Sequence, residues 1–191
     1  MTVSERYTEL KRKVVSRREE FADLTDFIET QTSYLAAPAS TKYHLCHEGG
    51  LLEHSVNVAE TILKLRKTLA PDLDEESCVI VALLHDLGKA GVPGQPQYIE
   101  NLPNEKQQRY GYHANAPFRF NTQLTYLSVP FRSLYLILPN LPLTQEEAQA
   151  IAYHDGQYVQ ENKCVAAKES KLTLLLQYAD NWSGFAIERE E

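Results

Sequence analysis

The sequence predicts an all-α protein of one domain, and three observations support this prediction. Apolar residues recur at the i, i+3, i+4, i+7 spacing of an amphipathic helix in several separate segments. The length of 191 residues suits one domain with one sizeable core. The composition, with 43% hydrophobic and 24% charged residues, is ordinary for a globular protein.

Three helices are expected in the first ninety residues, and local residues mark where they begin and end. Pro38 stops the first helix, and the turn "HEGG" at 47–50 precedes the second. Asp72 or Asp74 is the expected N-cap of the third. The expected helices cover residues 3–35, with a break near Arg17, then 51–69 and 75–86.

Residues 88–128 are expected to form a long irregular insertion, because they hold four of the nine prolines and four of the eight glycines. A short β-hairpin between 96–100 and 109–114 is expected within it. Its aromatic residues could cap a pocket and stack a base; the alternative is a packed surface excursion or a contact with a second copy of the chain. Helices are expected again near 130–138, after the N-cap Thr144, and over 169–184.

The net charge of −7 argues against nucleic-acid binding through a broad basic surface. An anionic substrate remains compatible with this charge if a metal ion supplies local positive charge. The three cysteines form no C-x-x-C pair and do not predict a disulfide framework. The first residues lack an apolar signal region, and no apolar run approaches the roughly 18 residues of a membrane span. We therefore expect a soluble, cytoplasmic protein with no membrane partner.

Four side chains on predicted helices are candidate metal ligands. His54 lies on the apolar stripe of its helix, where a hydrogen-bonded core histidine is the alternative. His85 and Asp86 end a nearly apolar run, and we expect Gly88 to stop that helix through a left-handed residue. Asp180, taken alone, is equally explained as a surface or capping aspartate. Three helices that each present nitrogen or oxygen ligands on their buried sides nevertheless indicate a divalent metal site in a bundle core.

Four motifs occur in order over roughly residues 38–185. They are "GGLLEHS" (49–55), "LLHDLGK" (83–89), "AIAYHDG" (150–156) and "YADNWS" (178–183). With them the chain resembles the HD-domain metal-dependent phosphohydrolases, including the HD domain of a bacterial 3′–5′ exoribonuclease. The resemblance implies an HD-type helical bundle for residues 38–185, with an N-terminal helical segment at 1–37 packed on it and a C-terminal tail at 186–191.

The resemblance also implies a metal site. The implied ligands are His54, His85, Asp86 and Asp180, and the ion is Mn, Fe, Ni, Co, Zn or Mg. Val129 stands where some members of the family carry an extra histidine, and Asp155 stands where a second one is sometimes found. We therefore expect one firmly bound metal and leave a second site open.

Three residues are expected to act in catalysis. Asp86 combines metal ligation with accepting a proton from the nucleophilic water. Lys89 reaches a phosphate oxygen or, alternatively, faces the helix dipole as an end-of-helix cation. His154 matches another histidine of the family and is expected to donate to phosphate or to bind a second metal, the alternative being a satisfied surface histidine.

Three further residues are candidates for substrate binding. His44 and His47 precede the first ligand helix and are expected to line the pocket mouth, although both are also explained as loop histidines. Arg132 is a candidate phosphate clamp, and the alternative is a pair with an acidic residue. With these residues, the resemblance implies hydrolysis of a phosphate ester, and we expect the ester to be that of a nucleotide or related small molecule. Two other functions stay open: exoribonuclease-like cleavage of short single-stranded nucleic acid, and a non-catalytic metal- or nucleotide-binding module. A homo-oligomer is also left open.

Overall fold

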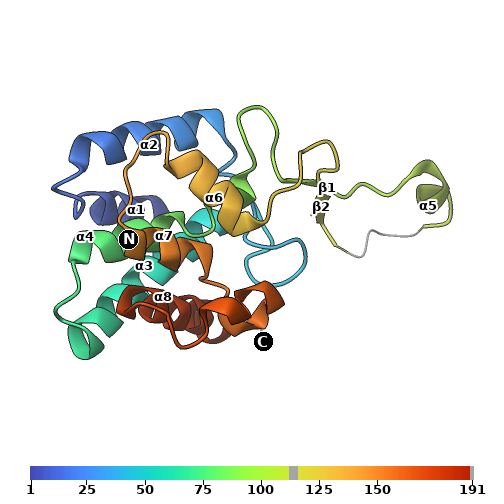
Figure 1. Cartoon of the computed structure of the whole chain (residues 1–191). Coiled ribbons are helices and arrows are strands. Elements are labelled where there is room, and N and C mark those ends of the chain that lie inside the picture. The colour runs from blue at the N-terminus through green and yellow to red at the C-terminus, as the bar shows by residue number, and fades with distance from the viewer. Residues whose placement is uncertain (112–115, 190–191) are drawn as a thin grey trace.

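The computed structural model describes residues 1–111 and 116–189 and shows a helical body with an arm on one side (Figure 1). The body consists of α1 (Val3–Lys11), α2 (Arg18–Gln31), α3 (Gly50–Leu69), α4 (Glu75–Leu84), α6 (Val129–Ile137), α7 (Gln145–Ala152) and α8 (Lys171–Trp182). The arm carries β1 (Tyr98–Glu100), α5 (Glu105–Arg109) and β2 (Phe118–Phe120). Short 3-10 turns lie at Leu87–Ala90, Gly156–Tyr158 and Gln160–Val165, and a π-helix spans Ser183–Ile187. The predicted all-α class is confirmed.

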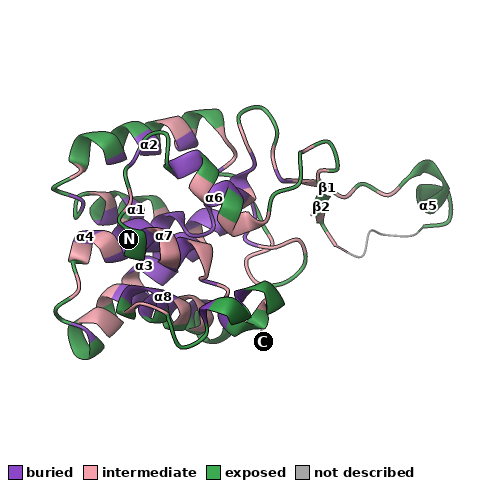
Figure 2. Cartoon of the chain, in the orientation of Figure 1, coloured by how far each residue is buried: buried purple, intermediate pink, exposed green. Residues whose placement is uncertain are grey.

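The core is centred on α4, which packs against α3, α7 and α8. Every residue from Cys78 to Leu84 is at most 1% exposed, so α4 is apolar and buried all round from Cys78 onward. Figure 2 shows the buried residues gathered on the inner faces of the helices of the body. The apolar stripe of α3 faces α4 with side chains such as Leu51, Val58 and Ile62, each 0% exposed. The helix that carries His54 and the helix that ends directly before His85 are thus held rigidly by the packing of the core.

The N-caps of α4 and α7 and the break between α1 and α2 are where the sequence predicted them. The Asp74 carboxylate accepts a hydrogen bond from the Ser77 amide at 2.8 Å and caps α4. Thr144 and Glu147 form a reciprocal capping box at the start of α7. The first predicted helix breaks near Arg17, as expected, and α2 starts at the next residue.

The predicted β-hairpin in the insertion is right for its first strand and wrong for the strand that pairs with it. The strand β1 forms within the expected stretch, but it pairs antiparallel with β2, with Tyr98 opposite Phe120. Asn104 and Gln107 cap each other reciprocally, so the segment before the expected second strand turns into α5 instead. Residues 112–114 of that expected strand lie outside the described residues.

Arg17 joins three parts of the body through buried ion pairs. Its Nε donates to Glu76 Oε1 of α4 at 2.9 Å, and its two terminal nitrogens donate to the Glu147 carboxylate of α7 at 2.8 and 2.6 Å. Glu76 also accepts hydrogen bonds from the backbone amides of Val15 and Ser16, both at 2.7 Å. The break between α1 and α2 is therefore fixed to the ends of two core helices.

The buried carboxylate of Glu76 is expected to make part of the free energy of unfolding depend on acid pH. Burial alone would raise its pKa, but hydrogen bonds from Arg17, Ser16 and Val15 lower the pKa to about 2. The pKa of a glutamate in the unfolded chain is about 4.3, so the lower pKa in the folded state adds on the order of 3 kcal/mol to the free energy of unfolding above that pH. This contribution is lost as the pH falls toward 2. In urea unfolding, the stability difference between the unmodified protein and Glu76→Gln should shrink between pH 5 and 3. A difference independent of pH would contradict this account.

None of the helices in residues 1–111 and 116–189 combines the length and the apolar character needed to cross a lipid bilayer.

Candidate metal centre

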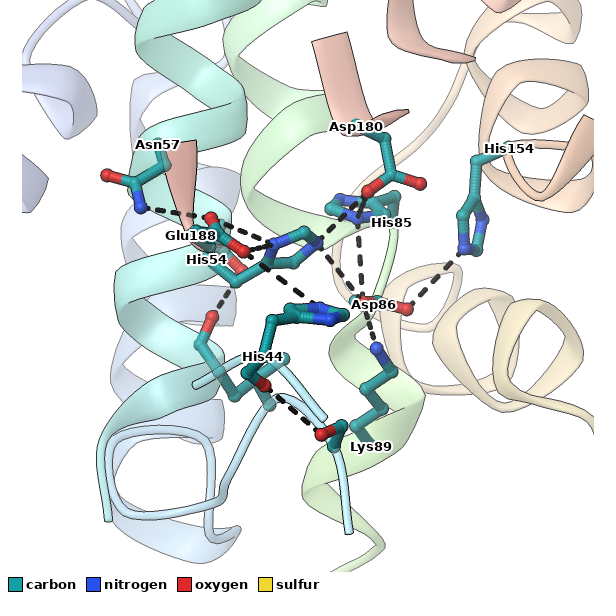
Figure 3. Close-up of polar contacts among 12 residues, drawn as sticks. His44, His54, Asn57, His85, Asp86, Lys89, His154, Asp180 and Glu188 are labelled. Atoms are coloured by element: carbon teal, nitrogen blue, oxygen red, sulfur yellow. Dashed lines mark hydrogen bonds and ion pairs between the residues drawn. The ribbon is translucent and has the colours of Figure 1, made fainter. Parts of the chain in front are cut away.

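The four predicted metal ligands converge at one end of the core (Figure 3). His54 comes from the second turn of α3, His85 and Asp86 directly follow α4, and Asp180 comes from α8. His54 Nε2 lies 3.1 Å from Asp180 Oδ1 and 3.6 Å from Asp86 Oδ2. His85 Nε2 lies 3.6 Å from Asp86 Oδ2 and 3.9 Å from Asp180 Oδ1. Two imidazoles and two carboxylates therefore face a common point.

His85 presents an unsatisfied nitrogen to that point. Its Nδ1 lies 2.8 Å from the Ala82 carbonyl oxygen, an acceptor, so Nδ1 must donate and carry the proton. Its Nε2 is fully buried and has no hydrogen-bond partner among the described residues. A buried polar atom without a partner costs on the order of 1–3 kcal/mol, and a metal ion would satisfy this lone pair. The donor set of nitrogen and carboxylate oxygen fits a divalent transition metal.

The pKa values of His85 and His54 are shifted in opposite directions. Burial lowers the pKa of His85 to about 4, so the ring stays neutral and Nε2 keeps its lone pair. Burial would also lower the pKa of His54, but the carboxylates of Asp180, Glu188 and Asp86 raise it to about 10. The same negative charge that attracts a proton to His54 would attract a divalent cation.

Of the two candidate carboxylate ligands, Asp86 and Asp180, Asp86 contacts more charged side chains. Its Oδ2 lies 2.5 Å from Lys89 Nζ, and its Oδ1 lies 3.4 Å from His154 Nε2. Burial alone would raise the pKa of Asp86, but Lys89 and the two histidines His85 and His154 lower it well below its usual range. Asp180 behaves in the same way: burial opposes ionisation, and the His54 hydrogen bond lowers its pKa. Both carboxylates are therefore ionised and able to hold a cation.

His154 is the third histidine at this point. Its Nδ1 lies 2.9 Å from the Ile151 carbonyl oxygen, so its Nε2 also faces the cluster. The ring centroids of His85 and His154 are 4.8 Å apart. Ligand atoms of His85, His154 and Asp180 all lie within 4.8 Å of one another. The predicted catalytic residues Asp86, Lys89 and His154 are thus brought together with the predicted ligands.

Gly88 has a different role from the one predicted. It lies in the 3-10 turn after α4 and has no positive φ; the positive φ of 81° belongs to Gly91, which ends that turn. A Cβ on Gly88 would lie 2.3 Å from the Val129 carbonyl oxygen, so the glycine permits α6 to pack directly on the turn. Its amide donates to Ser133 Oγ at 2.8 Å, and Ser133 Oγ donates to the His85 carbonyl at 2.8 Å. The close contact fixes the backbone beside His85.

The two loop histidines, His44 and His47, lie in different surroundings. The His44 ring lies 5.3 Å from the His54 ring and faces the cluster, and burial lowers its pKa. His47 is half exposed; its Nδ1 lies 3.0 Å from the Glu48 carbonyl and its Nε2 lies 3.7 Å from Glu53. The structure therefore brings His44, and not His47, to the candidate centre. A substrate contact stays a prediction for both.

Arg132 is buried and is bound by the insertion. Its guanidinium donates to the Gln97 side-chain oxygen and, at 2.8 Å, to the Thr125 carbonyl. Neither partner is the acidic residue of the alternative interpretation. Arg132 thus connects α6 to both ends of the arm, and its contact with a phosphate stays a prediction.

Sequence reasoning missed Glu188, which lies in the segment expected to be a tail. The π-helix continues α8, and its last turn returns Glu188 to α3, where the carboxylate is buried. Glu188 Oε2 lies 2.9 Å from His54 Nδ1. The stretch "AIEREE" reads as a polar terminus, and no periodic pattern distinguishes position 188 from its neighbours.

A family model of the HD domain matches residues 51–183, which is more than half of the chain and includes all four candidate ligands. The chain belongs to the HD-domain superfamily of metal-dependent phosphohydrolases. One curated relative of this HD protein is a dihydroneopterin 2′,3′-cyclic phosphate phosphodiesterase from Methanocaldococcus jannaschii, 33% identical over 86 residues. That alignment covers 42% of this chain and 34% of the relative, so the HD protein matches about a third of the relative's length. No solved structure matches the chain.

Proposed function

We propose that this HD protein is a divalent-metal-dependent phosphohydrolase that cleaves a phosphate ester of a nucleotide or a related small molecule. The observation that carries the proposal is the buried, unpartnered Nε2 of His85, which faces the carboxylates of Asp86 and Asp180. The proposed ligands are His54, His85, Asp86 and Asp180. A cation held there would supply Lewis acidity toward water and toward phosphoryl oxygens.

The substrate class follows from charge and from the relative. The relative acts, by its name, on a 2′,3′-cyclic phosphate of a pterin, which is a phosphodiester attached to a heterocycle. The net charge of −7 disfavours a long polyanion such as RNA as the substrate. We therefore propose a small phosphate ester, with cyclic phosphodiesters of nucleosides as the first compounds to test.

The residues around Asp86 have separate proposed roles. Lys89 is one-fifth exposed at its side chain and keeps Asp86 ionised through the 2.5 Å ion pair. An ionised Asp86 accepts a proton from the attacking water, and His154, on the other carboxylate oxygen, is placed to donate one to the leaving oxygen.

Removal of the metal is expected to abolish hydrolysis reversibly. Treatment with EDTA followed by desalting should reduce phosphate-ester hydrolysis to background, and Mn²⁺, Co²⁺ or Ni²⁺ should restore it. The measurement is product release from a panel of 2′,3′-cyclic nucleotides, nucleoside monophosphates and a labelled single-stranded RNA, with elemental analysis of the same samples.

The panel separates the candidate functions. Turnover of the small esters alone supports the proposal, whereas stepwise shortening of the RNA would favour the exoribonuclease-like alternative. Metal bound in stoichiometric amount without turnover of any compound would instead indicate a non-catalytic module and overturn the proposal.

A further inference from the structure

We infer that Glu188 is a positioning residue that orients His54 toward the metal, an inference that rests on the proposed function. In Figure 3 the carboxylate of Glu188 and that of Asp180 approach the His54 ring from opposite edges. Glu188 Oε2 lies 2.9 Å from Nδ1, and Asp180 Oδ1 lies 3.1 Å from Nε2. With Nδ1 donating to Glu188, Nε2 is the nitrogen that faces Asp180 and Asp86, and its lone pair would be the one offered to a cation that displaces the Nε2 proton.

The position of Glu188 is itself held by hydrogen bonds. Its Oε1 accepts from Asn57 Nδ2 at 2.9 Å, and Asn57 Oδ1 accepts from Arg6 Nη2 of α1 at 2.8 Å. Arg6 is in turn held by Glu60, at 2.8 Å from each carboxylate oxygen. This chain of contacts runs from the N-terminal helix to His54, so the carboxylate is preorganised for His54.

The π-helix explains how a residue beyond α8 reaches α3. The amide of Glu188 donates to the Ser183 carbonyl at 2.9 Å, a bond across five residues that widens the last turn. Ser183 is buried, and its hydroxyl lies 3.4 Å from Thr61 of α3. The same helix therefore delivers Asp180 to one edge of the His54 ring and Glu188 to the other.

Glu188 is better placed to orient His54 than to ligate the same ion. Ligand atoms of His44, His54 and Glu188 do lie within 4.8 Å of one another. Within that group Glu188 Oε2 already contacts Nδ1 of His54 at hydrogen-bonding distance, 2.9 Å, without an ion between them. His44 Nε2 is farther from Glu188, at 3.9 Å.

The test compares Glu188→Gln and Glu188→Ala with a matched control, Glu76→Gln. Glu76 and Glu188 are both buried carboxylates in an ion-paired network, but Glu76 lies at the opposite end of α4 from His85. We expect Glu188→Ala to weaken the Kd for Zn²⁺ by 10- to 100-fold, Glu188→Gln by less, and Glu76→Gln by less than about threefold. Competition with a chromophoric chelator measures each Kd.

A second readout distinguishes orientation from a general loss of packing. In the Zn²⁺-loaded, ¹⁵N-labelled protein, the Nδ1 proton of His54 should give a slowly exchanging downfield signal that Glu76→Gln leaves in place. This signal should move upfield in Glu188→Gln and disappear in Glu188→Ala, and its absence from His54→Asn assigns it.

The outcomes separate this inference from the proposed function. An unmodified protein that binds metal and hydrolyses the ester, with a Kd and an Nδ1 signal unchanged in Glu188→Gln and Glu188→Ala, overturns the role of Glu188 and leaves the function standing. An unmodified protein that binds no divalent metal overturns both. Weakened binding together with the altered signal supports the inference even where the substrate differs from the one proposed.

Discussion

Asp86→Asn is expected to lower kcat/KM for phosphate-ester hydrolysis by about 10³-fold or more. Asparagine keeps the shape of the side chain but removes the charge that lies 2.5 Å from Lys89 and 3.6 Å from each of the His54 and His85 Nε2 atoms. The substitution removes a proposed anionic metal ligand and the proposed proton acceptor in one step. The measurement is kcat/KM together with metal content per folded protein.

Asp72→Asn is the control for this prediction. Asp72 is exposed and pairs with the exposed Lys171 at 2.7 Å, so kcat/KM should change less than about twofold. Thermal melting followed by circular dichroism reports whether Asp86→Asn is folded. A folded Asp86→Asn variant with activity within tenfold of the unmodified protein would refute the role given to Asp86.

Arg17→Ala is expected to destabilise the protein by about 3–5 kcal/mol, because two buried carboxylates would lose their shared cation. Glu147 is 0% exposed at its side chain and Glu76 is 7% exposed, so both carboxylates would stay in a poorly solvated site without the guanidinium that neutralises them. Arg17→Lys should recover only part of the loss, since an ammonium cannot bind both carboxylates in the forked geometry. Urea unfolding at pH 7 measures both variants.

Arg12→Ala provides the comparison, because Arg12 pairs with Glu9 on the surface, where both side chains are more than half exposed. Its loss should cost no more than about 1 kcal/mol. Equal destabilisation by Arg12→Ala and Arg17→Ala would show that the buried network contributes no more than a surface pair.

The helices and the candidate ligands were predictable because both depend on local patterns. The helical spacing of apolar residues in 51–69 placed His54 on a buried face. The apolar run before His85 predicted a helix in the interior of the protein, and this helix is α4. The order of the motifs added the pairing of these residues with Asp180. Burial and spacing along one helix are properties that a sequence displays directly.

Contacts between distant segments were not predictable in the same way. Gly88 was interpreted as a helix stop because the sequence shows a glycine but not the Val129 carbonyl that lies against it. The strand β1 pairs with residues eighteen to twenty-two positions farther on, and α5 lies in the connection between the two strands, the stretch in which the sequence suggested the second strand. Glu188 lay beyond the last recognised motif, and a π-turn leaves no signature in the hydrophobic pattern.

The backbone anchoring of the histidine rings has a consequence for ion selectivity. His85 and His154 each donate Nδ1 to the carbonyl three residues earlier, so neither ring can rotate to offer its other nitrogen. The imidazole side of the centre is thus fixed in position. A divalent cation held there would meet stationary nitrogens, and any adjustment to an ion of different radius, such as Mn²⁺ in place of Ni²⁺, would fall to the oxygen atoms of the Asp86 and Asp180 carboxylates.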